Sequence, residues 1–223
     1  MRVMPYSWAA ETPVSNFETR LDNATRERED KAAYVKFKLK EKPKGAPEAE
    51  NYYLIAWTTT PWTLPSNLAL AVGDLVYKAW AHENGDCYIA GTNAEPKIID
   101  KVWESGIVKT AELFKTSLLG LTYEPLFPYF ADTPNAFRVL DGSEFVTDGD
   151  GTGIVHMAPG FGEVDQKCCA ENGIEVLVPV DEKGRFTDAI FDLPPTETQG
   201  GFGSPAGGER PLQANNNTYR VAS

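Results

Sequence analysis

Residues 51–61 read Asn-Tyr-Tyr-Leu-Ile-Ala-Trp-Thr-Thr-Thr-Pro and predict a buried β-strand. The apolar and aromatic run from Tyr52 to Trp57 has the composition typical of such strands. Proline cannot donate a hydrogen bond to a sheet ladder, so we expect the strand to stop before Pro61. Three consecutive threonines therefore stand where the chain leaves the predicted sheet.

Further strands are predicted on both sides of this stretch. Upstream, apolar residues alternate with lysines between Tyr34 and Lys40, as in a half-buried strand. The other predicted strands span residues 75–82, 86–90, 137–140, 153–157 and 175–180, and short helices are predicted over 97–103 and 164–171. Strands outnumber helices and are unevenly spaced, which favours an α+β, β-rich fold with a β-barrel-like core and short peripheral helices over a doubly wound parallel sheet.

The composition predicts one globular domain with dissimilar ends. Of the 223 residues, 42% are hydrophobic and 24% are charged, so a core can form. We predict an irregular lead-in over residues 1–30, the domain itself over 31–195, and a flexible tail rich in glycine and proline over 196–223. An artificial addition or a variant insertion would explain the tail.

Charge, hydropathy and cysteine content narrow the class of protein. The net charge of −11 argues against affinity for nucleic acid through charge alone, although it allows a local basic patch. No apolar run is long enough to span a membrane and no secretory signal is recognisable, so we expect a cytoplasmic protein. The spacing of Cys87, Cys168 and Cys169 matches no zinc or redox motif, which predicts reduced thiols.

The first group of candidate site residues lies at positions 57–67, Trp-Thr-Thr-Thr-Pro-Trp-Thr-Leu-Pro-Ser-Asn. Hydroxyl groups both donate and accept hydrogen bonds, and the two prolines stiffen the backbone that carries them. Trp57 and Trp62 offer flat surfaces for stacking on a base or on a bound side chain. The alternative is a strand end whose threonines satisfy local backbone groups, and the residues alone favour this alternative.

The second group lies at positions 148–165, where glycine-rich turns flank a short strand. Glycine lets the backbone approach a ligand closely. His156 stands among apolar residues at the end of the strand, and the residue alone favours a structural histidine over a functional one. Asp165 opens a helix, where its carboxylate either caps the helix or faces an ammonium group. One histidine and scattered carboxylates give no metal-ligand spacing, so we predict no metal site.

Together the two groups resemble the editing domain that is inserted into the catalytic domain of isoleucyl-tRNA synthetases. Residues 57–67 nearly repeat the threonine-rich peptide of that family, and residues 151–165 match its second editing motif. Residues 4–7 and 12–18 resemble the lead-in of eukaryotic-like members. The valyl and leucyl enzymes typically have Thr-Thr-Arg-Pro where Pro61 and Trp62 follow the threonines here. The resemblance extends to about residue 190 and leaves out the tail.

This resemblance implies hydrolysis of valine misattached to tRNA(Ile), with the larger isoleucine excluded by size. It implies that Asp165 anchors the α-ammonium group and that His156 stands at the side-chain subsite. It also implies that the ester, the terminal adenosine and the attacking water are held by Thr58, Thr59, Thr60 and Asn67. No cofactor is implied. The implied partners are the valine-charged 3′ end of tRNA(Ile) and the rest of the synthetase.

Several alternatives remain open at this point. The chain lacks the ATP-binding signatures of its enzyme class, so we expect no aminoacylation from it alone. The resemblance leaves open whether the adenylate is edited as well as the ester. A valyl- or leucyl-type editing domain, a non-catalytic module that binds aminoacyl-tRNA or adenylate, and a purely structural insertion are the competing hypotheses.

Overall fold

The computed structural model describes residues 6–7, 12–15, 17–21, 32–94, 106–147, 149, 151–181, 185–190 and 220–222. The chain divides into two compact units, one of residues 1–30 with 180–208 and one of residues 31–179 with 209–223. The helix predicted over 97–103 lies outside the described residues, as does most of the tail.

The first unit contains only short elements in its described part. Strands β1 (Tyr6–Ser7) and β2 (Thr12–Pro13) pair antiparallel, and η1 (Glu18–Arg20) is a single 3-10 turn. In the same unit, Val180 and Phe186 form an isolated β-bridge. The extended stretch before Val180 forms no regular strand, so the predicted strand over 175–180 is wrong.

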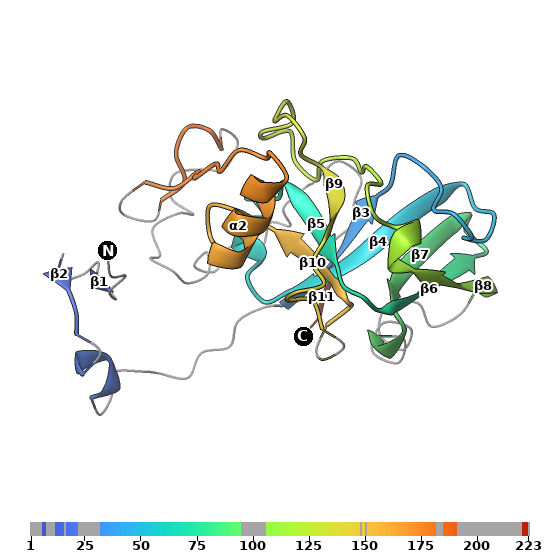
Figure 1. Ribbon diagram of the computed structural model, residues 1–223, viewed down its shortest axis with the longest axis horizontal. Coiled ribbons are helices and arrows are strands. Elements are labelled where there is room, and N and C mark those ends of the chain that lie inside the picture. Colours follow the sequence, from blue (N-terminus) through green and yellow to red (C-terminus); the bar gives the residue numbers. More distant parts are fainter. Residues whose placement is uncertain are drawn as a thin grey trace. The chain divides into compact units, whose positions relative to one another are not determined.

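A six-stranded sheet dominates the second unit (Figure 1). Its strands are β11 (Arg220–Ala222), β3 (Ala32–Lys38), β4 (Asn51–Thr58), β7 (Asp86–Gly91), β6 (Val76–His82) and β8 (Ile107–Phe114), in that spatial order. All neighbours are antiparallel except β4 and β7. The strands predicted near 34–40, 51–60, 75–82 and 86–90 are confirmed, whereas β8 was not predicted. Gly85, at a φ of +87°, lies in the turn between β6 and β7.

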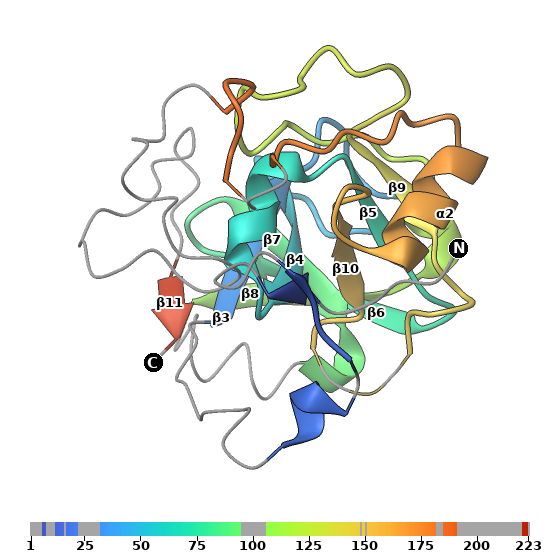
Figure 2. The same cartoon turned by 90° about the vertical axis from the view of Figure 1, so that its left-hand side faces the viewer.

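A three-stranded sheet carries the second candidate motif (Figure 2). Its central strand β5 (Ala69–Val72) pairs antiparallel with β10 (Ile154–Met157) and parallel with β9 (Arg138–Asp141). The strands predicted over 137–140 and 153–157 are therefore confirmed. All four residues of β5 are buried, which places this strand in the interior of the unit.

Backbone contacts join the two sheets into a barrel-like circuit. At one junction Leu39 bridges Tyr123 and Thr122 bridges Arg138, which connects the end of β3 to β9. At the other, the Gly91 N–H donates to the Thr152 carbonyl at 2.7 Å and connects the end of β7 to the start of β10. The ring of neighbours thus runs β3, β4, β7, β10, β5, β9 and back to β3. The predicted β-barrel-like, β-rich fold is confirmed.

Helix α2 (Glu163–Glu171) lies beside β9 and β10 in both views (Figures 1 and 2). It begins one residue before the predicted helix and ends at the predicted residue, shortly before Gly173, whose φ is +69°. Its Cys168 and Cys169 are buried, as is Cys87 on β7, and all three thiols are free.

Aromatic residues fill the space between the two sheets. The ring of Tyr123, which has no exposed surface, packs edge-on against Phe37 at 5.4 Å and against Phe137 at 5.9 Å between centroids. A second apolar cluster lies among strands of the six-stranded sheet and includes Tyr53, Trp80 and Tyr88. The Lys36 ammonium lies 4.5 Å from the centre of the Tyr53 ring. The sheet that carries the threonine-rich turn is therefore well packed.

Candidate functional site

The threonine-rich turn begins where β4 ends and continues into η2 (Pro61–Ser66). The Thr60 N–H donates to Thr58 Oγ1 at 3.0 Å, and the two hydroxyl groups of Thr58 and Thr60 lie 3.3 Å apart. The side chain of Thr59 between them is exposed. The Thr58 hydroxyl therefore satisfies a local backbone N–H group, which is the alternative that the residues alone favour. The Thr59 side chain, in contrast, is accessible to a ligand.

The two candidate motifs meet through Thr63 and His156, which are 93 residues apart in sequence. Thr63 Oγ1 lies 2.8 Å from His156 Nε2 and also donates to the Thr60 carbonyl at 2.8 Å. The sequence did not single out Thr63, although it lies inside the first motif. Its position three residues after Thr60, in a turn that begins with proline, is the signal that would have drawn attention to it.

His156 lies on β10 and is 9% exposed. Burial lowers the pKa of His156 to about 4, because an enclosed imidazolium ion loses its hydration. The ring is therefore neutral near neutral pH. Among the described residues, its buried Nδ1 atom has no hydrogen-bond partner.

Asp165 lies in the first turn of α2 and is partly buried. Its Oδ2 accepts a hydrogen bond from the Ala158 N–H at 2.8 Å, which ties the turn after β10 to the helix. Burial raises the pKa of Asp165, and hydrogen bonds from the N–H groups of Ala158 and of Asp165 itself offset part of this rise. The side chain does not cap the helix in the usual way, because the position before the helix is Gly162.

The turn between His156 and Asp165 is tightly packed at Gly160. A Cβ atom added there would overlap the Leu177 carbonyl oxygen, which belongs to the backbone and cannot swing aside. We therefore expect Gly160→Ala to lower the free energy of unfolding by about 1–3 kcal/mol, the usual cost of overpacking. Urea denaturation measures this change.

The matched control is Gly149→Ala. A Cβ atom at Gly149 would meet its nearest neighbour, Thr147 Oγ1, at an ordinary distance of 3.8 Å. This variant is expected to stay within about 0.5 kcal/mol of the parent chain. Equal free energies of unfolding for the two variants would show that the turn at Gly160 rearranges to accommodate the added methyl group without loss of stability.

Asn67 stands apart from the other predicted site residues. Its Oδ1 accepts a hydrogen bond from the buried Tyr123 hydroxyl at 2.7 Å, and its Nδ2 donates to the Ala69 carbonyl at 2.9 Å. With 4% of its surface exposed, the side chain holds η2 against the core. Its predicted contact with substrate stays a prediction, and the bonds present point to support of the turn.

The two tryptophans flank the threonine-rich turn and are both half-buried. Trp57 pairs across the sheet with Tyr34, and its ring lies close to Gly151, where an added Cβ atom would be 3.5 Å from Trp57 Cε3. Trp62 is the second residue of η2. Both rings keep exposed surface on which a ligand can pack.

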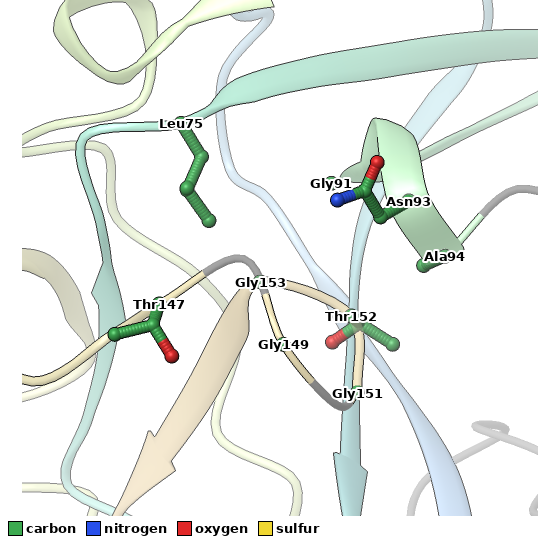
Figure 3. A pocket seen from close by; sticks show the side chains of 9 residues that line it. All are labelled: Leu75, Gly91, Asn93, Ala94, Thr147, Gly149, Gly151, Thr152 and Gly153. Carbon is green, nitrogen blue, oxygen red and sulfur yellow. The ribbon is translucent and has the colours of Figure 1, made fainter.

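A shallow pocket opens beside the start of β10 (Figure 3). It encloses about 200 Å³, open solvent included, and its lining is formed by Leu75, Gly91, Asn93, Ala94, Thr147, Gly149, Gly151, Thr152 and Gly153. None of the predicted site residues lines it. Four of its lining residues, Gly149, Gly151, Thr152 and Gly153, belong to the second motif, but the histidine and the aspartate of that motif do not line it.

Two further features are absent from the described ranges. Within them, no group of three or more His, Cys, Asp or Glu side chains is placed to hold a metal ion. No helix in the same ranges has the length and apolar character needed to cross a lipid bilayer.

Solved structures of leucyl-tRNA synthetase editing domains resemble this chain. The structure titled GlLeuRS-CP1 matches with a TM-score of 0.51 over 63% of this chain and 59% of that one, at 20% identity. The editing domain of the P. knowlesi cytosolic leucyl-tRNA synthetase matches with a TM-score of 0.50 over 66% and 63%, at 12% identity. The fold is that of the editing domain of class I aminoacyl-tRNA synthetases.

Sequence relatives narrow the class further. The isoleucine–tRNA ligase of Rickettsia prowazekii (strain Madrid E) is 51% identical over 205 residues, and that of Rickettsia felis is 52% identical over 206. These matches cover 86% of this chain and 19% of each ligase, so the chain spans about a fifth of their length. No protein-family model matches the chain. Over its matched residues the chain is therefore similar to a segment of the isoleucine–tRNA ligases, and it has the fold of a synthetase editing domain, which confirms the resemblance.

Proposed function

We propose that this domain hydrolyses the ester bond of valine misattached to tRNA(Ile) and excludes isoleucine by size. The observation that carries the proposal is the direct hydrogen bond between Thr63 and His156, because it joins both motifs in one place. A site assembled from a hydroxyl-rich turn, a neutral histidine and a partly buried carboxylate suits an aminoacyl ester, which has an ammonium group and a reactive carbonyl.

Asp165 is the proposed anchor of the α-ammonium group. Among the described residues no cation pairs with this partly buried carboxylate, and burial raises its pKa because the charged form loses hydration. An ammonium ion beside it would supply the missing charge and form a charge-assisted hydrogen bond. The bond from Ala158 N–H already fixes one carboxylate oxygen and so orients the other.

His156 is the proposed wall of the side-chain subsite. A neutral, buried ring adds bulk without attracting water or charge. One methylene group separates valine from isoleucine, so a rigid wall discriminates by leaving no room for it. The hydroxyl groups of Thr58, Thr59 and Thr60 would hold the ester and the attacking water, so that positioning supplies most of the rate.

The proposal extends to partners and location. The valine-charged 3′ end of tRNA(Ile) would be the substrate, and the remainder of the synthetase would deliver it. We place this activity in the cytoplasm. The net charge of −11 makes weak affinity for the tRNA body the expected behaviour of the domain alone.

Deacylation of Val-tRNA(Ile) and Ile-tRNA(Ile) by the chain tests the proposal. We expect catalytic loss of valine at least about tenfold faster than that of isoleucine, a margin in line with the worth of one methylene group already known from isoleucyl-tRNA synthetases. Loss of valine in proportion to the amount of protein added would indicate a binding module. Equal rates for both esters would contradict selection by size.

A further inference from the structure

We propose that Thr63 is a positioning residue that fixes His156 in one tautomer, with the proton on Nε2, and thereby fixes the orientation of the ring. The inference deepens the proposed function, on which it rests, because it identifies what keeps the wall of the subsite in place. In this role Thr63 acts through His156 and not on the reacting atoms themselves.

The argument begins with the single proton of the Thr63 hydroxyl. The Thr60 carbonyl can only accept, so at 2.8 Å the hydroxyl must donate to it. The same oxygen lies 2.8 Å from His156 Nε2. Because its proton is already used, Oγ1 can only accept there, and Nε2 must carry a hydrogen. The hydrogen bond made by one ring nitrogen thus sets the state of the other.

The surroundings of Nδ1 point to the same tautomer. This atom is buried, and the described residues offer it no partner. A proton on Nδ1 would be an enclosed donor with no acceptor, while the bare Nε2 would face the lone pairs of Thr63 Oγ1. Both features disfavour that tautomer. An imidazolium ion is disfavoured for the same reason, which agrees with the lowered pKa of His156.

The backbone makes Thr63 a stable support. Its own N–H donates to the Thr60 carbonyl at 3.0 Å, so the backbone N–H and the hydroxyl of Thr63 both donate to the same carbonyl. With 7% of its surface exposed, the side chain has little room to turn. A hydroxyl held in this way offers its lone pair to the ring in one fixed direction.

Nitrogen NMR of the histidine rings tests the proposal directly. The chain has two histidines, so His82→Gln leaves the ring of His156 as the remaining signal. We expect a protonated Nε2 and an unprotonated Nδ1 near neutral pH. A protonated Nδ1 in the parent chain would overturn the proposal whether or not the domain hydrolyses any ester.

Two substitutions extend the test to specificity. Thr63→Val keeps the shape and the backbone N–H but removes the acceptor, so we expect mixed tautomers and a loss of about tenfold in the preference for Val-tRNA(Ile). Thr63→Ser restores the oxygen and should restore both properties. Thr110→Val, at an exposed position of β8, is the matched control. A single Nε2–H tautomer in Thr63→Val would contradict the positioning role.

Discussion

Asp165→Ala is expected to lower the rate of Val-tRNA(Ile) hydrolysis by about 100-fold. Removing one partner of an enclosed, charged hydrogen bond costs about 2–5 kcal/mol, and each 1.4 kcal/mol is a factor of ten. The loss should appear in kcat/KM measured by deacylation, because the proposed ammonium anchor would act both in binding and during the reaction. It is the largest effect that we expect of one side chain on activity.

Asp165→Asn separates the two tasks of this carboxyl group. The amide oxygen can still accept the hydrogen bond from Ala158 N–H, but the negative charge is gone. If the negative charge of Asp165 is decisive, we expect the Asp165→Asn variant to be nearly as inactive as the Asp165→Ala variant. Full activity of Asp165→Asn, together with loss of activity in Asp165→Ala, would show that Asp165 only holds the turn. Glu163→Gln removes a charge from the same helical turn at an exposed position and is the matched control.

Acidification should destabilise the folded chain through His156. The unfolded state binds a proton near pH 6.5, whereas the folded state does so only near pH 4. Stability due to the neutral ring is therefore complete above the unfolded pKa and is lost as pH falls from about 6.5 toward about 4. Linkage makes the loss about 3 kcal/mol over that window. Urea denaturation at several pH values measures it.

The variant His156→Phe isolates this contribution, because it keeps an aromatic ring and removes the titration. Its stability should fall less than that of the parent chain over the same range. The raised pKa of Asp165 acts in the opposite direction, since the folded state then takes up a proton more readily, so only the difference between the two chains is diagnostic. Parallel pH profiles would show that His156 is hydrated in the folded state.

Strands could be predicted from the sequence where burial produces an alternating or a continuously apolar pattern of residues. Alternation around β3 and the apolar run of β4 were visible because each strand differs clearly from its flanking loops. Strand β5 was missed because all four of its residues are buried, which removes the alternation. Strand β8 was missed because it exposes Val108 and Phe114 and its pairing is irregular opposite Ala81. Both failures arise from tertiary packing, which a local pattern does not contain.

The wrong strand over 175–180 has a similar cause. Its residues suit a strand, but among the described residues its only pairing is the bridge from Val180 to Phe186. At the candidate site, residue type and resemblance together indicated the threonines, His156 and Asp165. The link through Thr63 depends on an atom-to-atom approach between distant segments. Likewise, the inward bonds of Asn67 depend on Tyr123, 56 residues away.

The junction of the two motifs also has a consequence for folding. Thr63 and His156 are separated by 93 residues, and the ladder between β5 and β10 sets their register. Contacts so distant in sequence form late, after the entropy of closing the intervening loop has been overcome. A slip of one residue in that ladder would turn Val155 toward the threonines in place of His156. If the proposed hydrolysis depends on this junction, only chains that have formed it would cleave an ester, and specific activity would then measure the fraction of native molecules.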